Sequence, residues 1–371
     1  MQAWLVLKDG TIYEGTSFGY SPKKGETIEG EVVFNTGMTG YPETLTDPSY
    51  RGQILVSTYP LQGTYGIPDW DAVSVAGLRT HFESDAVHVT GLVVSEYQEE
   101  PSHFTKEQSL GAFLEEHRVP AISGIDTRAI VQKIREHGAM PGKIYVGTLP
   151  SGAALKTFSR DTDTEDLVRQ VSIEEVTEYR SGSIRIVLPD TGCKLNIIRS
   201  LLQFDTTIIR VPHDYPFMDE REAGNLQFDA LFIPNGPGNP ALNKKLIAQV
   251  RKALEAKVDT FGICLGNQIV ALAGGCQSKK LPYGHRGQNQ PCRDVDTNHC
   301  IVTSQNHGFA VVEEGMPKNI KPWFVNVHDG SIEGVQFTDR PARAVQFHPE
   351  SYPGPVDADY LFKNFIDSIT K

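Results

Sequence analysis

Two kinds of hydrophobic pattern divide the chain. Up to about residue 150, short apolar runs alternate with turn residues, which is typical of β-strands. These runs predict strands at 3–7, 11–14, 31–35, 53–59 and 87–95. Two segments have helical spacing: 110–117, and a stretch that Asp126 caps and Gly138 ends. The pattern predicts a compact, mostly β domain with a few helices.

From residue 184 onward, predicted strands and helices alternate. Strands are expected at 184–188, 207–211, 230–234 and 260–263, and helices at 194–204, 242–256 and 266–273. This order implies a parallel sheet, whose ligands bind outside the carboxyl ends of the strands. The predicted fold class is α/β: an open, mainly parallel C-terminal sheet with helices on both faces, plus a mostly β N-terminal domain with a few helices.

A polar stretch separates these two parts. Residues 151–183 show little sustained apolar period, and we interpret them as a connection with one or two short helices. A length of 371 residues also favours two domains over one core. The predicted organisation is a domain at 1–150, a linker at 151–183 and a second domain at 184–371.

Composition and charge exclude several classes of protein. A net charge of -11 argues against general nucleic-acid binding, and no apolar run is long enough to span a bilayer. The first residues are interpreted as a strand entering the Asp9-Gly10 turn rather than as a signal peptide. Five cysteines without a CxxC pair disfavour both a disulfide framework and a structural zinc site. We expect the cytosol or an organelle interior, and no metal.

Cys264 stands at the junction of a predicted strand and helix. Gly262 and Gly266 flank it in a G-x-C-x-G pattern, which is the arrangement of a nucleophile elbow. The helix N-terminus beneath the side chain favours a thiolate. The alternative is a buried cysteine in a glycine-rich turn, and the pattern leaves the two interpretations about equal.

His348 and Glu350 provide a candidate base and a group to orient it. Pro349 forces His348 into an extended conformation, so the two side chains can project to the same side. A carboxylate beside an imidazole fixes its tautomer and stabilises its cationic form. A surface His-Pro-Glu turn is the alternative, and the sequence does not show whether His348 lies near Cys264.

A glycine-rich segment at 235–241 follows another predicted strand. Its spacing imitates a dinucleotide fingerprint, but Pro237 and Pro240 remove N–H donors that a pyrophosphate would use. Exposed glycine amides in a stiff turn suit an oxyanion hole better. An ordinary loop is the alternative.

Taken together, and in the chain order 235–241, 262–266 and 348–350, the three segments resemble the class I (triad) glutamine amidotransferases, whose glutaminase site uses Cys, His and Glu. Further segments are similar to the small subunit of carbamoyl-phosphate synthetase, and the likeness runs over nearly the whole chain. These segments are 31–43, 46–50, 124–128 and 304–309. Residues 283–291 are closer to the glutaminase portions of the eukaryotic multidomain synthetases.

The resemblance implies a role for individual residues. Cys264 would attack the glutamine carboxamide, His348 would transfer protons, and Glu350 would orient His348. The backbone amides of Leu265 and Gly238 would stabilise the oxyanion. The other implied glutamine contacts are Ser49, Gly236, Gln268, Asn306, Gly308 and Phe309, with Ser49 contributed by the first domain.

The resemblance also implies a partner. Ammonia would pass to a large synthetase subunit or fused domain, which would hold ATP, magnesium and bicarbonate, so no cofactor is expected in this chain. The product would serve arginine or pyrimidine synthesis, and the sequence does not say which.

One departure concerns Asn267, where the family usually has histidine. Two alternatives stay open: a catalytically weak or silent regulatory subunit, and another triad-family hydrolase that cleaves γ-glutamyl peptides.

Overall fold

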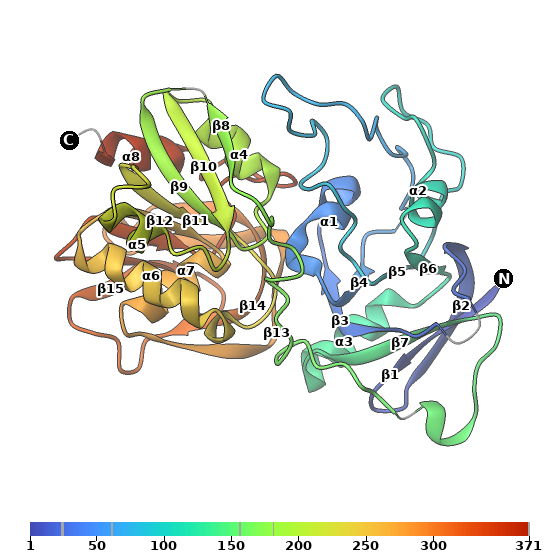
Figure 1. The fold of residues 1–371 in the computed structure, drawn as a ribbon. Helices are drawn as coiled ribbons and strands as arrows, with labels where there is room; N and C mark the ends of the chain where they lie inside the picture. Colours follow the sequence, from blue (N-terminus) through green and yellow to red (C-terminus); the bar gives the residue numbers. More distant parts are fainter. Residues whose placement is uncertain (24–25, 61, 156, 181, 370–371) are drawn as a thin grey trace. The chain divides into compact units, whose positions relative to one another are not determined.

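The computed structural model describes residues 1–23, 26–60, 62–155, 157–180 and 182–369. Its contacts divide the chain into two compact units (Figure 1). The first unit comprises Met1–Ser74 and Arg79–Glu165, and the second comprises Val75–Leu78 together with the chain from Asp166 onward.

The first unit is built on a closed barrel with the strand order β1-β2-β6-β5-β4-β3-β7. Pairing is parallel from β3 through β4 and β5 to β6, and antiparallel around the rest of the barrel. The strands are β1 Gln2–Leu7, β2 Ile12–Gly19, β3 Ile28–Asn35, β4 Gln53–Ser57, β5 Gly91–Val94, β6 Pro120–Ser123 and β7 Met140–Val146.

Short helices accompany this barrel, and side-chain caps explain where two of them begin. Ser109 accepts a hydrogen bond from the Ala112 amide, and Asp126 accepts one from the Ala129 amide, so each helix starts at a satisfied N-cap. The predicted cap at Asp126 is confirmed. The helices are α1 Tyr41–Thr46, η1 Pro48–Tyr50, α2 Leu110–Glu116, α3 Thr127–His137 and η2 Gly152–Leu155.

The second unit contains one large mixed sheet with the order β14-β13-β15-β16-β17-β12-β11-β9-β10-β8. The adjacent strands β17, β12, β11, β9 and β10 are parallel, and antiparallel strands extend both sides. The strands are β8 Thr177–Arg180, β9 Ile184–Asp190, β10 Thr206–Pro212, β11 Ala230–Ile233, β12 Asp259–Ile263, β13 Gln277–Asp294, β14 Cys300–Val312, β15 Ile320–Asn326, β16 Ile332–Phe337 and β17 Ala342–Val345.

Helices cover both faces of this sheet (Figure 1). Buried side chains of α5, α6 and α7 pack into one core cluster, and those of α4 and α8 into another. The apolar periodicity of each helix faces the sheet, which is the ordinary driving force for a layered α/β unit. The helices are α4 Leu195–Leu201, α5 Phe217–Glu222, η3 Pro240–Leu242, α6 Lys244–Glu255, α7 Leu265–Ala273 and α8 Tyr360–Ile369.

The α/β class predicted from the sequence is confirmed, but the parallel part is confined to five adjacent strands. The long antiparallel pair β13 and β14 was not predicted, because β13 is rich in Lys, Gly, Pro and Gln and has no clean apolar alternation. β13 and β14 are stabilised by pairing with each other, and a pattern within one segment does not reveal such pairing.

The stretch predicted as a linker is part of the packed structure. Leu167 and Val168 are buried, and β8 pairs antiparallel with β10 at the sheet edge. The contact division between the units falls between Glu165 and Asp166. Among the described residues, no helix combines the length and apolar character needed to cross a membrane.

Candidate active site

Polar residues gather at the carboxyl edge of the parallel strands, where ligands of open α/β sheets bind. Lys194 follows β9, Gly236 follows β11, Cys264 follows β12 and His348 follows β17. Because β9, β11, β12 and β17 are adjacent and parallel, their following loops meet at one edge. The structure therefore brings three predicted segments together and adds a fourth, the loop after β9.

Cys264 occupies a strained turn between β12 and α7. Its φ is 55° and its ψ is −104°, a conformation that L-residues rarely adopt, and it is the N-cap of α7. A Cβ on Gly262 would lie 2.6 Å from the Gly266 carbonyl oxygen, and one on Gly266 would lie 2.1 Å from the Ile233 carbonyl oxygen. Both glycines are therefore required by the close approach of strand and helix, as the nucleophile elbow predicts.

His348 and Glu350 are buried beside this turn. His348 Nδ1 lies 2.6 Å from Glu350 Oε1, and the backbone amide of His348 donates to the Ser304 carbonyl at 2.9 Å. By geometry, His348 Nε2 has no hydrogen bond within the described part of the chain. The Cys264 thiol is nevertheless close enough to interact with the ring. Cys264, His348 and Glu350 thus form the predicted Cys–His–Glu constellation.

Lys194 joins Cys264, His348 and Glu350, and these four residues form one buried array. Its Nζ donates to Glu350 Oε1 at 2.9 Å and to the Ser351 carbonyl at 2.5 Å, and the ion pair is almost fully buried. The Lys194 amide donates to Asn235 Oδ1 at 2.9 Å, which ties this loop to the glycine-rich segment. One carboxylate oxygen therefore receives hydrogen bonds from both a lysine and a histidine.

The charges of this array set the protonation of its members. Burial opposes a charged His348, but Glu350 and the Cys264 thiol outweigh it and raise the pKa of His348 to about 10. Burial likewise opposes a charged Glu350, but Lys194 and His348 lower the pKa of Glu350 to about 2. At neutral pH the pair is an imidazolium and a carboxylate, so His348 is ready to give a proton.

Gln268, one helical turn into α7, is held in a single orientation by a network of amides. Its Nε2 donates to the Phe309 carbonyl at 2.8 Å and to Gln346 Oε1 at 3.1 Å. A backbone carbonyl only accepts, so the nitrogen must face Phe309 and Gln346 must present its oxygen. Asn267 Nδ2 donates to the same Gln346 oxygen at 3.2 Å. Gln268 Oε1 is therefore the atom that remains to accept a hydrogen bond from a ligand.

The other predicted site residues lie at different places around this edge. Gly236 approaches the Thr191 carbonyl so closely that a Cβ would lie 2.0 Å from its oxygen, and Gly238 has a φ of 81°. Leu265 is the first residue of α7, and Asn306, Gly308 and Phe309 lie on β14, where the Asn306 carbonyl accepts from Cys264 Sγ at 3.7 Å. The contacts of these residues with glutamine stay predictions.

Ser49 belongs to the first unit. It lies in η1, where its amide donates to the Asp47 carboxylate at 2.9 Å, and it is buried. Its implied contribution to the glutamine site also stays a prediction.

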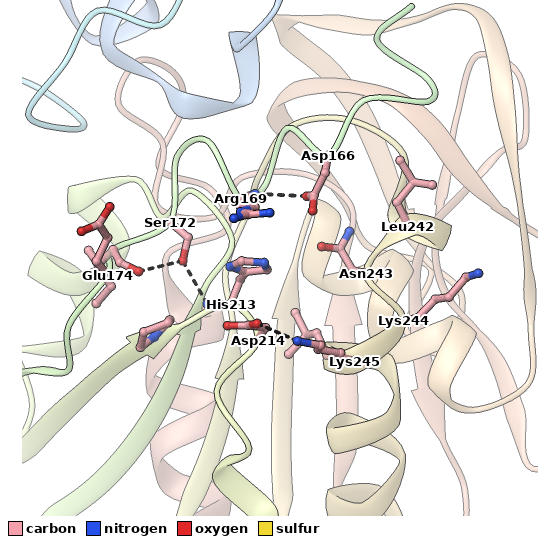
Figure 2. A pocket seen from close by; sticks show the side chains of 13 residues that line it. Asp166, Arg169, Ser172, Glu174, His213, Asp214, Leu242, Asn243, Lys244 and Lys245 are labelled. Atoms are coloured by element: carbon pink, nitrogen blue, oxygen red, sulfur yellow. Dashed lines mark hydrogen bonds and ion pairs between the residues drawn. The ribbon is translucent and has the colours of Figure 1, made fainter.

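A cavity of about 630 Å³ opens elsewhere in the second unit, between the end of β10 and the start of α6 (Figure 2). It contains none of the predicted site residues. Three cationic side chains line it, Arg169, Lys244 and Lys245, and they are matched by Asp166, Glu174 and Asp214. The cationic and acidic side chains in its lining are therefore equal in number.

Sequence reasoning missed Lys194 and Gln346. The strand-end rule could have found Lys194, because it is the first residue of a predicted helix that follows a predicted strand. Gln346 precedes His348 by two residues in an extended segment, so it was a candidate for the same face of the strand. The sequence alone does not indicate that Lys194 contacts Glu350, or that Gln346 contacts Asn267 and Gln268.

Two family models cover most of the chain. Residues 187–368 match the model described as Glutamine amidotransferase class-I, and residues 5–144 match Carbamoyl-phosphate synthase small chain, CPSase domain. The first match, together with the elbow and the buried Cys–His–Glu array, defines the second unit as a class I glutamine amidotransferase domain.

Curated relatives extend the likeness over nearly the whole chain. The carbamoyl phosphate synthase small chain of Pyrococcus furiosus is 41% identical over 98% of this chain and 97% of its own length. The arginine-specific small chain of Emericella nidulans is 43% identical over 100% of this chain and 80% of its own. The chain therefore belongs to the carbamoyl-phosphate synthase small chain family, as the sequence resemblance predicted.

A second group of relatives is much longer. Multifunctional protein pyr1-3 of Dictyostelium discoideum is 41% identical over 98% of this chain, which spans only 17% of that protein.

Proposed function

We propose that this chain is the glutaminase component of a glutamine-dependent carbamoyl-phosphate synthetase. The observation that carries the proposal is the buried array at the elbow, in which Cys264 interacts with His348, Glu350 holds His348 in its cationic form, and Lys194 keeps Glu350 ionised. A cysteine nucleophile needs an adjacent base and a group that orients the base, and the array provides both.

In the proposed reaction, the Cys264 thiolate attacks the carboxamide carbon of glutamine. His348 gives its proton to the leaving nitrogen as the carbon–nitrogen bond breaks, so ammonia departs and a γ-glutamyl thioester remains. His348 then takes a proton from water, the hydroxide attacks the thioester, and glutamate and the thiol are released. Glu350 keeps the ring in one tautomer, and the amides of Leu265 and Gly238 would stabilise the oxyanion.

The site also explains how the α-amino group of glutamine could be recognised. Gln268 has both amide hydrogens engaged by Phe309 and Gln346, so its oxygen presents an acceptor. An α-ammonium group is a donor, and we assign Gln268 to it. Asn306, Gly308, Phe309, Gly236 and Ser49 remain the proposed contacts for the rest of the substrate.

The destination of the ammonia belongs to the proposal as well. A separate large subunit or a fused domain would use it with ATP, magnesium and bicarbonate, and the relatives include both a small chain and multifunctional proteins. The proposed setting, the cytosol or an organelle interior, rests on cysteine usage, because all five cysteines are free thiols.

Covalent labelling tests the nucleophile directly. A glutamine-analogue electrophile such as a diazoketone should add once per chain, at Cys264, and glutamine hydrolysis should disappear in Cys264→Ala. Cys300→Ala, which removes the exposed thiol, is the matched control and should keep both labelling and activity. Folded chain that does not label at Cys264 would indicate a silent subunit. Faster cleavage of γ-glutamyl peptides than of glutamine would indicate a different hydrolase.

A further inference from the structure

A second cluster of buried, chemically active side chains lies apart from the Cys–His–Glu array. It consists of His285 on β13, His307 on β14 and Glu333 on β16, whose ligand atoms all lie within 4.8 Å of one another. His285 and His307 are direct partners across the β13–β14 pair, and their rings meet edge to face at 5.0 Å. Register shifts on both sides of this paired segment turn the local side chains, as β-bulges commonly do beside functional sites.

In each histidine, the ring nitrogen that points away from Glu333 already has a hydrogen-bond partner. His285 Nε2 lies 2.9 Å from the Asp329 carboxylate, and His307 Nδ1 lies 2.9 Å from the Phe309 carbonyl. Metal-binding histidines almost always donate their second N–H to a carboxylate or a backbone carbonyl, which fixes the tautomer. The remaining nitrogens therefore face Glu333: His285 Nδ1 at 3.0 Å from Oε1, and His307 Nε2 at 3.8 Å from Oε2.

His307 Nε2 is surrounded by atoms that accept hydrogen bonds, and the described residues provide no hydrogen for them to share. Its Nδ1 must carry a hydrogen because the Phe309 carbonyl only accepts, and a neutral imidazole carries only that one hydrogen. Nε2 therefore presents a lone pair. Glu333 is fully buried, and its Oε2 has no hydrogen-bond partner within the described residues.

Gln305 contributes a third acceptor. Its Oε1 lies 3.2 Å from His307 Nε2, while its Nε2 donates to Thr303 Oγ1 at 3.2 Å. The Thr303 hydroxyl already donates to the Gln290 carbonyl at 2.8 Å, so toward Gln305 it accepts, which fixes the amide orientation. Gln305 Oε1 and Glu333 Oε2 thus both lie near the lone pair of His307 Nε2, and a bound cation or a proton would satisfy these acceptors.

We propose that His285, His307 and Glu333 bind a single divalent transition-metal ion, with zinc the preferred ion and Gln305 Oε1 as the fourth ligand. Two imidazoles and one carboxylate are a known donor set for zinc. Zinc bonds of about 2.0–2.2 Å place tetrahedral ligand atoms roughly 3.3–3.6 Å apart. The Glu333 carboxylate lies at a similar spacing from both rings, with Oε1 3.0 Å from His285 Nδ1 and Oε2 3.8 Å from His307 Nε2. Calcium and magnesium prefer sites made of oxygen ligands.

The ion would join three strands that also carry glutamine-site residues. His307 lies between Asn306 and Gly308 on β14, and the carbonyl to which it donates, that of Phe309, is also the acceptor for Gln268. Buried and without an open coordination position, the ion would be structural, holding β13, β14 and β16 together. This role goes beyond the proposed glutaminase reaction and does not depend on it.

Metal analysis and zinc titration test the proposal. The chain should be produced without a histidine tag, stripped with chelator, and titrated with zinc against a chromophoric competitor. We expect one zinc per chain, a rise in the thermal unfolding midpoint on binding, and no competition from magnesium. Asp329→Asn, which changes only the partner of His285, should weaken binding by about 10–100-fold. Glu333→Gln and His285→Gln should weaken it further.

Two controls separate this site from other ligands of zinc. His299→Gln removes an exposed histidine and should leave the affinity unchanged. Cys264→Ala removes the thiol beside His348 and should still bind one zinc. Binding that survives Glu333→Gln and His285→Gln but disappears in Cys264→Ala would overturn the proposal. A stoichiometry of zero would also overturn the proposal, because a proton would then occupy the gap between Glu333 and His307.

Discussion

Lys194 Nζ lies 2.9 Å from Glu350 Oε1, and this is the same oxygen that His348 Nδ1 contacts at 2.6 Å. The lysine and the carboxylate side chains are 4% and 0% exposed. A buried carboxylate shared by two cations keeps both of them charged, because each loss of a partner would leave an uncompensated charge away from water. The array therefore contains three coupled charges, those of Lys194, Glu350 and His348, in addition to the Cys264 thiol.

Replacing the lysine tests this unit. Lys194→Met should lower the free energy of unfolding by about 3–5 kcal/mol, as breaking a buried ion pair on one side does. Urea unfolding of variant and parent measures the difference. The matched control is Lys245→Met, which breaks an exposed pair with Asp214 and should cost less than about 1 kcal/mol. If both variants lose the same stability, the buried pair has no special role.

A second prediction concerns the pH dependence of stability. The pKa of His348 rises from 6.5 to about 10 on folding, so its charge stabilises the folded state fully below pH 6.5 and stops doing so as the pH passes 10. The stability difference between the parent and His348→Gln should therefore shrink between pH 6.5 and 10. Unfolding by urea across this range measures it, and a difference that grows with pH would contradict the assignment.

Glu350 gives the opposite dependence. Its pKa falls from 4.5 to about 2 on folding, so its stabilising effect is present above pH 4.5 and is lost as the pH falls toward 2. The difference between the parent and Glu350→Gln should disappear on the acid side. A difference that is constant from pH 5 down to 2 would show that the carboxylate is not ionised in the folded chain.

Gln346 should control how well glutamine is recognised. Gln346→Leu removes the acceptor shared by Gln268 and Asn267, so Gln268 can rotate and its oxygen is no longer fixed toward the substrate. We expect KM for glutamine to rise about 10-fold, the equivalent of one hydrogen bond of ~1.4 kcal/mol, with a smaller change in kcat. Discrimination against an analogue without the α-amino group should weaken as well.

The control for this variant is Gln336→Leu on β16, whose amide donates to Asp296 at 2.7 Å. It should leave KM unchanged. A general loss of stability in Gln346→Leu with unaltered discrimination between the two substrates would show that Gln346 is a packing residue only.

The elbow glycine at 266 should not tolerate a side chain. In Gly266→Ala the new Cβ would meet the Ile233 carbonyl oxygen at 2.1 Å, so β11 and α7 must separate. We expect about 3 kcal/mol of lost stability and loss of glutaminase activity, since Cys264 moves with the helix. Gly224→Ala has no atom within 4 Å of the added Cβ and should keep activity, losing only the ~1–2 kcal/mol of its positive φ. Activity retained in Gly266→Ala would contradict the proposed constraint.

Local pattern determined a great deal of this protein. The strand–turn–helix unit around Cys264, the cap at Asp126 and the alternation from β9 to α7 follow from periodicity, capping and glycine placement over a few residues. Each of these depends on neighbours in the chain, and each was found in the structure. His348 and Glu350 were also within reach of sequence reasoning, because two residues apart in an extended segment they share a face.

Tertiary structure alone decided which distant residues meet. Lys194 lies in a loop far along the chain from Glu350, and no periodicity relates the two. The pairing of β13 with β14 places His285 opposite His307, and Glu333 lies beside them on β16. The composition of β13 gave no prediction of a strand. The physical reason is that side-chain patterns report which face of an element is buried, whereas strand order and register decide what that face buries against, and those are set by contacts across the whole sheet.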